Sequence, residues 1–110
     1  MTTRTALLAL DTLTIAAATN PTIYTVPAGR VTIIRSTIIH NRGAATATFE
    51  ERTRVGAQMR AMRALSLATL AVDTYEVWRV LEAGDELILR NTGASNISLS
   101  YWVSGAELVA

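Results

Sequence analysis

The residues of this chain that could perform acid–base or nucleophilic chemistry are few and lie far apart. His40 is the only histidine of the 110 residues, and no serine or cysteine lies at a spacing that would make it a catalytic partner. The chain contains no G-x-S-x-G elbow, and Ser104-Gly105 is typical of the end of a strand. We therefore interpret His40 as a structural residue at a strand end and predict that the protein is not an enzyme.

The carboxylates occupy positions that favour turns and solvated strand faces. Glu82 and Asp85-Glu86 flank a turn, and Glu50-Glu51 lie within a strand. A glycosidase needs two carboxylates that face each other across a cleft, which this pattern does not indicate. The sequence also contains no calcium loop and no glycine-rich phosphate loop. We predict no catalytic, cofactor-binding or metal-binding residue, and no cofactor.

The absence of cysteine excludes disulfides, thiolate catalysis and zinc–thiolate sites. The apolar stretch of residues 6–10 is short and is followed by Asp11, so it resembles neither a secretory core nor a membrane span. We expect synthesis in the cytosol without export by a signal of the protein's own.

The basic residues are all arginine, and the net charge is +1. Arginine suits protein interfaces, although the codon usage of a GC-rich genome explains the same composition. The densest basic cluster comprises Arg52, Arg54, Arg60 and Arg63. It could contact an acidic partner or nucleic acid, or it could be a solvated loop and strand edge offset by Glu50 and Glu51. Because no aromatic residues are interleaved for base stacking and the net charge is small, we expect no binding to nucleic acid or membranes.

Two tryptophans, Trp78 and Trp102, are the largest apolar side chains. They could form a sugar-stacking platform, as in a carbohydrate-binding module. We favour a place in the core or at a subunit interface, because tryptophan is common among buried interface anchors.

The elements that must position these residues are strands separated by turns. The chain is organised around residues 24–41, where Pro27-Ala28-Gly29 forms a turn and a β-branched strand follows over residues 31–40. Further strands are predicted at residues 23–26, 45–52, 75–81, 86–90 and 97–103, followed by a short tail over 106–110. Residues 53–70 are ambiguous: we favour a loop followed by a strand over residues 60–68, with a short helix as the alternative. Residues 1–20 are an N-terminal arm or a first strand, and residues 21–110 form the body.

Seven or eight strands at spacings near ten residues predict an all-β fold, an antiparallel β-sandwich of the jelly-roll kind. A short internal repeat agrees with two Greek-key halves, although chance could also produce it. Ala28-Gly29 precedes Ile33-Ile34-Arg35 at the same separation at which Ala83-Gly84 precedes Ile88-Leu89-Arg90.

Three turn motifs carry a resemblance to a known group of proteins: YTVPAG at residues 24–29, VLEAGDEL at 80–87 and YWVSGAE at 101–107. Together they resemble small β-sandwich accessory proteins of tailed bacteriophages, found among head-decoration, head-fibre and tail-associated components. The resemblance covers residues 22–107, and residues 53–70 do not match it clearly. It implies a non-enzymatic, often trimeric protein that binds the virion lattice through arms, edges and loops.

On this resemblance we expect a capsid decoration or cement protein, made in the host cytoplasm and located in the virion. Its expected partners are copies of itself, as a homotrimer, and the major capsid protein or another virion protein. A neck or tail component is one alternative, and a carbohydrate-binding module that uses Trp78 or Trp102 is another.

Overall fold

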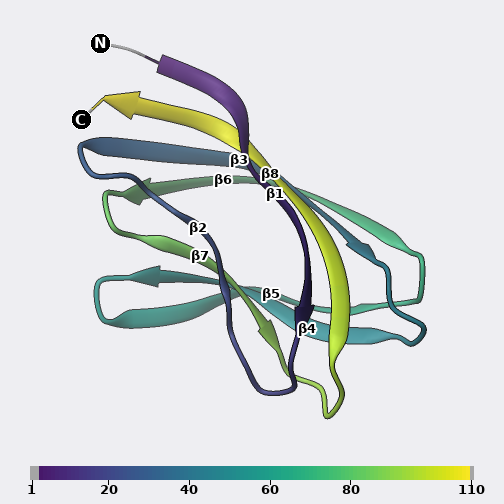
Figure 1. The fold of residues 1–110 in the computed structure, drawn as a ribbon. Coiled ribbons are helices and arrows are strands. Elements are labelled where there is room, and N and C mark those ends of the chain that lie inside the picture. The colour runs from purple at the N-terminus through teal and green to yellow at the C-terminus, as the bar shows by residue number, and fades with distance from the viewer. Residues whose placement is uncertain (1–2, 110) are drawn as a thin grey trace.

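Eight strands form two four-stranded antiparallel sheets in the computed structural model, which describes the backbone of residues 3–109 and the side chains of residues 8–76 and 78–109 (Figure 1). The strands are β1 (Thr3–Ile15), β2 (Thr22–Thr25), β3 (Arg30–Asn41), β4 (Ala47–Val55), β5 (Gln58–Leu67), β6 (Val72–Glu82), β7 (Glu86–Asn91) and β8 (Ile97–Val109). The strand orders are β1-β8-β3-β6 and β2-β7-β4-β5, which is the arrangement of a jelly roll. The predicted all-β antiparallel sandwich is confirmed.

The core lies between the two sheets and consists mainly of isoleucine, leucine and valine. Phe49 is its largest fully buried side chain, and Ile34, Ile39, Leu87 and Leu99 pack in the same cluster. Burial alternates along β4, where Ala47, Phe49, Glu51 and Thr53 point inward. This alternation brings the carboxylate of Glu51 into the interior.

Two asparagines at equivalent places hold the two Greek-key halves together. Asn41 donates from Nδ2 to the carbonyl oxygens of Ala45 and Leu67, both at 2.9 Å. Asn91 donates in the same way to Ser95 at 2.8 Å and to Ile15 at 3.0 Å. Each asparagine also accepts, at Oδ1, the backbone N–H two residues further on, at 2.9 Å in both cases.

The backbone repeats the same symmetry. The N–H of Leu70 donates to the carbonyl of Asn41 at 2.9 Å, and the N–H of Ala18 donates to that of Asn91 at 3.1 Å. Leu70 and Ala18 are the non-glycine residues with positive φ in the described backbone, at 61° and 60°. The chain therefore consists of two similar halves, in which β1 to β4 correspond to β5 to β8. The short sequence repeat lies at equivalent turns, where Gly29 and Gly84 have φ of 73° and 88°.

Residues 53–70 form more regular structure than expected. The predicted strand is present as β5, but the predicted loop before it is wrong, because β4 continues to Val55 and a two-residue turn at Gly56-Ala57 leads directly into β5. Thr53 is buried and pairs with Leu87 of β7 on one side and Arg60 of β5 on the other. No helix forms in the described residues, and hence none that is long and apolar enough to span a membrane.

The predicted strand end at Ser104-Gly105 is also wrong. β8 runs through this pair to Val109, and its last residues pair with both β1 and β3. Gly105 is there because β3 approaches it closely: a Cβ at this position would lie 2.0 Å from the carbonyl oxygen of Ile33. A register shift between Ile34 and Ser36 bulges β3 beside it. Ile34 and Ile39 are buried in the core, whereas the preceding Ile33 and Ile38 lie on the opposite face of the sheet.

The first strand, β1, pairs with β8 from Thr3↔Leu108 to Ile15↔Ile97. The two chain ends therefore lie at the same end of the sandwich, as Figure 1 shows. No part of residues 3–15 extends away from the body as an arm.

Candidate functional site

An apolar surface covers the outer face of the β1-β8-β3-β6 sheet. Strand β6 alternates strictly here, with Tyr75 and Leu81 directed inward and Trp78 and Val80 outward. The exposed fractions on this face are 53% for Leu10, 59% for Val72, 72% for Trp78 and 62% for Val80. Ile33, Ile38 and Trp102 lie on the same face and are half-buried. We call these seven residues the outer apolar face.

Neighbouring strands place these side chains in rows across the sheet. Leu10 of β1 lies opposite Trp102 of β8, which lies opposite Ile38 of β3. Ile33 of β3 lies opposite Val80 of β6. Cross-strand neighbours on one face are close enough for their side chains to touch, so each row is an apolar strip. The row formed by Ser104, Ser36 and Glu76 lies between the two strips. Exposed apolar patches of this kind mark interaction surfaces in soluble proteins.

Trp78 projects most from the outer apolar face. It is not part of the core, so that interpretation of this tryptophan is wrong. The guanidinium carbon of Arg35 lies 4.7 Å from the centre of its ring, at the bulge of β3. This cation–π contact orients the indole and leaves most of it exposed to a partner.

A shallow depression of about 410 Å³ lies on the same face, lined by Ile38, His40, Val72, Trp102 and Ser104. It contains the only histidine of the chain, near the end of β3. Ser104 Oγ is within 2.7 Å of Ser36 Oγ, and no hydrogen bond joins His40 to a serine among the described residues. The apolar lining suits a hydrophobic side chain better than a polar substrate.

A second feature is a buried charge cluster at the edge where β5 and β6 meet. Glu51 is fully buried, and Arg63 Nε of β5 donates to its Oε1 at 2.5 Å, while Thr37 donates to the same oxygen at 3.3 Å. Arg63 also pairs with Asp73 of β6 and lies over the ring of Tyr75, 4.1 Å from its centre. The arginine therefore joins the edge strands of the two sheets.

Burial raises the pKa of the Glu51 carboxyl, and the Arg63 guanidinium acts in the opposite direction. Glu51 Oε2 is buried without a hydrogen-bond partner, whereas Oε1 contacts Arg63 through both Nε and Nη2. Asp73 of β6 is the second carboxylate of this cluster, and Arg63 pairs with it and with Glu51. The cluster therefore links strands of the two sheets.

The arginine cluster predicted from the sequence does not form one basic patch. Arg52 pairs with Glu50 at 2.6 Å, and Arg54 with Glu86 at 3.3 Å. Arg63 is in the buried cluster. Arg60 Nη2 donates to Gln58 at 3.1 Å. Of the two interpretations offered by the sequence, the structure favours a strand edge whose charges are largely compensated within the chain.

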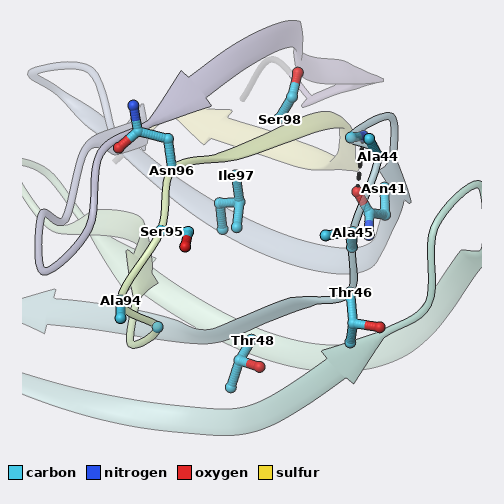
Figure 2. Close-up of a pocket in the computed structure, with 12 residues that line it drawn as sticks. Asn41, Ala44, Ala45, Thr46, Thr48, Ala94, Ser95, Asn96, Ile97 and Ser98 are labelled. Atoms are coloured by element: carbon cyan, nitrogen blue, oxygen red, sulfur yellow. Dashed lines mark hydrogen bonds between the residues drawn. The ribbon is translucent and has the colours of Figure 1, made fainter.

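The two asparagine loops enclose a pocket of about 370 Å³ at one end of the sandwich (Figure 2). Its walls are residues of equivalent loops, including Ala44, Thr46 and Thr48 from one half and Ala94, Asn96 and Ser98 from the other. None of the residues that line it is ionisable. The amides of Asn41 and Asn91 already bind backbone groups, so the pocket offers no acid, base or charged ligand group.

Among the side chains that the structure describes, no group of three or more histidine, cysteine or acidic residues is placed to hold a metal ion. Comparison with known proteins gives no matching family model and no significant match among curated proteins.

The outer apolar face was not predicted from the sequence. Each of its residues lies in a strand that also carries buried apolar residues, so the sequence alone does not distinguish the exposed apolar side chains from the buried ones. The alternation of Trp78 and Val80 with Tyr75 and Leu81 was the available signal.

Proposed function

We propose that the protein is a non-enzymatic structural subunit of a tailed-bacteriophage virion, a capsid decoration or other head-associated protein that oligomerises and binds the virion lattice. The observation that supports this proposal is the outer apolar face on a small jelly roll. The three turn motifs that resemble phage accessory proteins supply the class of virion, and they imply a trimer.

The apolar patch is large enough to be functional. Trp78, Val80, Val72 and Leu10 together expose on the order of 400 Å² of apolar surface, which is within the range of the largest patch on a typical monomer, and such patches are often interaction surfaces. Burying it would contribute roughly 10 kcal/mol before the costs of association are subtracted. A domain this small gains stability when a neighbour covers such a face.

Binding to capsids tests the proposal directly. Purified protein should co-sediment in fixed stoichiometry with expanded capsids of the phage or prophage that carries its coding sequence. Co-sedimentation with purified necks or tails instead would assign it to that part of the virion. Absence of binding to heads, necks and tails would refute a virion role.

A carbohydrate-binding module is the second candidate, and the exposure of Trp78 is the observation that favours it. A sugar would have to stack on the indole face that Arg35 leaves open. Glycan-array binding that is lost in Trp78→Ala, with the strand content by circular dichroism retained, would support this candidate over the first.

A further inference from the structure

We infer that the outer apolar face is the surface through which a second copy of this chain binds. The inference rests on the proposed function, because it names a surface and a partner for the self-association proposed there. A pair that uses the same patch on both copies has two-fold symmetry, so the inferred oligomer is a dimer and not the trimer that the resemblance implies. The partner is another copy rather than a different protein, because the face carries both a projecting tryptophan and a depression, and both an unpaired cation and an unpaired anion.

The shape is complementary to itself. Trp78 projects from β6, and the depression lined by Ile38, His40 and Trp102 lies on the same face. Val72 marks the rim of the depression, six residues from Trp78 along β6, or about 20 Å of extended strand. A second copy facing the first can therefore place its Trp78 in this depression and receive the first copy's indole in its own.

The charge pattern agrees with the same pairing. Arg35 of β3 and Glu76 of β6 are both exposed, and both lie at the bulge beside Trp78. Neither belongs to an ion pair among the described residues, whereas Arg52, Arg54 and Arg63 do. One unpaired cation and one unpaired anion on a face can be exchanged between two copies, which suits an interface that uses the same patch on both partners.

The apolar area suits a small, weak interface that dissociates on dilution. The strongly exposed side chains provide on the order of 400 Å², and the half-buried Ile33, Ile38 and Trp102 extend the patch toward the roughly 800 Å² per partner of a standard interface. A large exposed tryptophan near the centre is typical of an interface anchor.

The outer face of the other sheet lacks these features. Its central strand, β4, presents Thr48, Glu50, Arg52 and Arg54 outward, and the three charged residues pair within the chain, with one another or with Glu86. The outward residues of β4 are polar and their charges are paired within the chain, so covering them with a second copy would contribute little.

Sedimentation velocity over a range of protein concentrations tests the inference. The wild-type protein should have the mass of a dimer of 11.8-kDa chains and dissociate on dilution, and a stable trimer would overturn the inference. Trp78→Ser should raise the dissociation constant by about 30-fold or more, as expected for loss of a tryptophan anchor. Val55→Ser is the matched control, because Val55 is 54% exposed but lies at the end of β4, outside the outer apolar face. It should sediment like the wild type.

A charge exchange identifies the contact between copies. Arg35→Glu and Glu76→Arg should each weaken association, and the double variant should restore part of it. An oligomer that Trp78→Ser leaves unchanged would overturn the inference but not the proposed function, which capsid binding tests separately. A wild-type protein that stays monomeric at all concentrations would also overturn it. Circular dichroism of each variant verifies that the sandwich is intact.

Discussion

Gly105 shows how one residue can be fixed by a contact with a residue, Ile33, that is far away in the chain. β3 crosses so closely that its Ile33 carbonyl occupies the place of a Cβ on Gly105. The bulge of β3 at Arg35 accompanies this close approach. Any larger side chain must push β3 and β8 apart in the middle of the sheet.

We expect Gly105→Ala to lower the free energy of unfolding by about 3 kcal/mol, the upper range for overpacking a well-packed site. Gly93→Ala is the control, because its added Cβ would meet Asn91 Oδ1 at 3.4 Å, an ordinary contact. Urea denaturation at one fixed protein concentration measures both. A stability of Gly105→Ala equal to that of Gly93→Ala would show that the two strands separate without cost.

Glu51 is the other residue whose environment is set by the fold. Its carboxylate is buried and faces Arg63 of β5, Asp73 of β6 and the hydroxyl of Thr37 of β3. Burial raises its pKa above the ordinary value of 4.5 despite the arginine. Between 4.5 and the raised pKa the folded state holds more protons than the unfolded state, so this group makes the free energy of unfolding fall as pH rises.

Glu51→Gln should remove that dependence while keeping an oxygen that Arg63 can bind. The free energy of unfolding of the variant, relative to the wild type, should therefore increase as pH is raised from 4.5 through the raised pKa. Urea denaturation between about pH 4 and about pH 8 measures the difference. A difference that does not vary with pH would mean that Glu51 has the same pKa in both states.

At the scale of the elements, the two asparagine loops have equivalent roles in the two halves of the chain. Each side chain ties its own loop to the end of a strand in the other half of the chain, through three hydrogen bonds. Both asparagines are almost completely buried. Loss of the amide leaves two carbonyl oxygens and one N–H without partners at each loop.

Asn41→Ala and Asn91→Ala should each lower the free energy of unfolding by about 3 kcal/mol, since each removes three hydrogen bonds and leaves buried groups unsatisfied. Asn96→Ala serves as the control, because Asn96 is exposed in the second loop. Thermal and urea denaturation measure the three variants. If only one of the two buried asparagines mattered, the two halves would not be energetically equivalent.

The whole molecule is closed by pairing between its first and last strands. Thr3 lies opposite Leu108, so the two chain ends are adjacent, whereas the β4–β5 turn at Gly56-Ala57 is exposed at the other sheet. The sheets depend on strand pairing and on the core between them. The order in which the strands are connected contributes only loop entropy.

A circular permutant that joins the two ends through a short glycine-serine linker and opens the chain between Gly56 and Ala57 should therefore fold. We expect a loss of no more than about 2 kcal/mol in the free energy of unfolding, from the change in loop closure. Circular dichroism and thermal denaturation measure it against the parent chain. An unfolded permutant would show that the two-residue turn between β4 and β5 is essential.

The sequence by itself determined the strands and the class of fold. β-branched runs, proline–glycine turns and the spacing of the strands are local properties, and they predicted the antiparallel sandwich. Local patterns did not predict that β8 continues through Gly105, or that a two-residue turn and not a longer loop precedes β5. Both features depend on which strands pair with each other.

Only the tertiary structure decided what the side chains face. Trp78 and Leu81 lie in the same strand and are both apolar, yet one is exposed and the other is in the core, because the second sheet covers only one side of β6. The same packing buries Glu51 beside Arg63 and gathers Leu10, Trp102 and Val80 from three strands onto one face. Alternation divides a strand into two faces, but only the packed sheets decide which of them meets water.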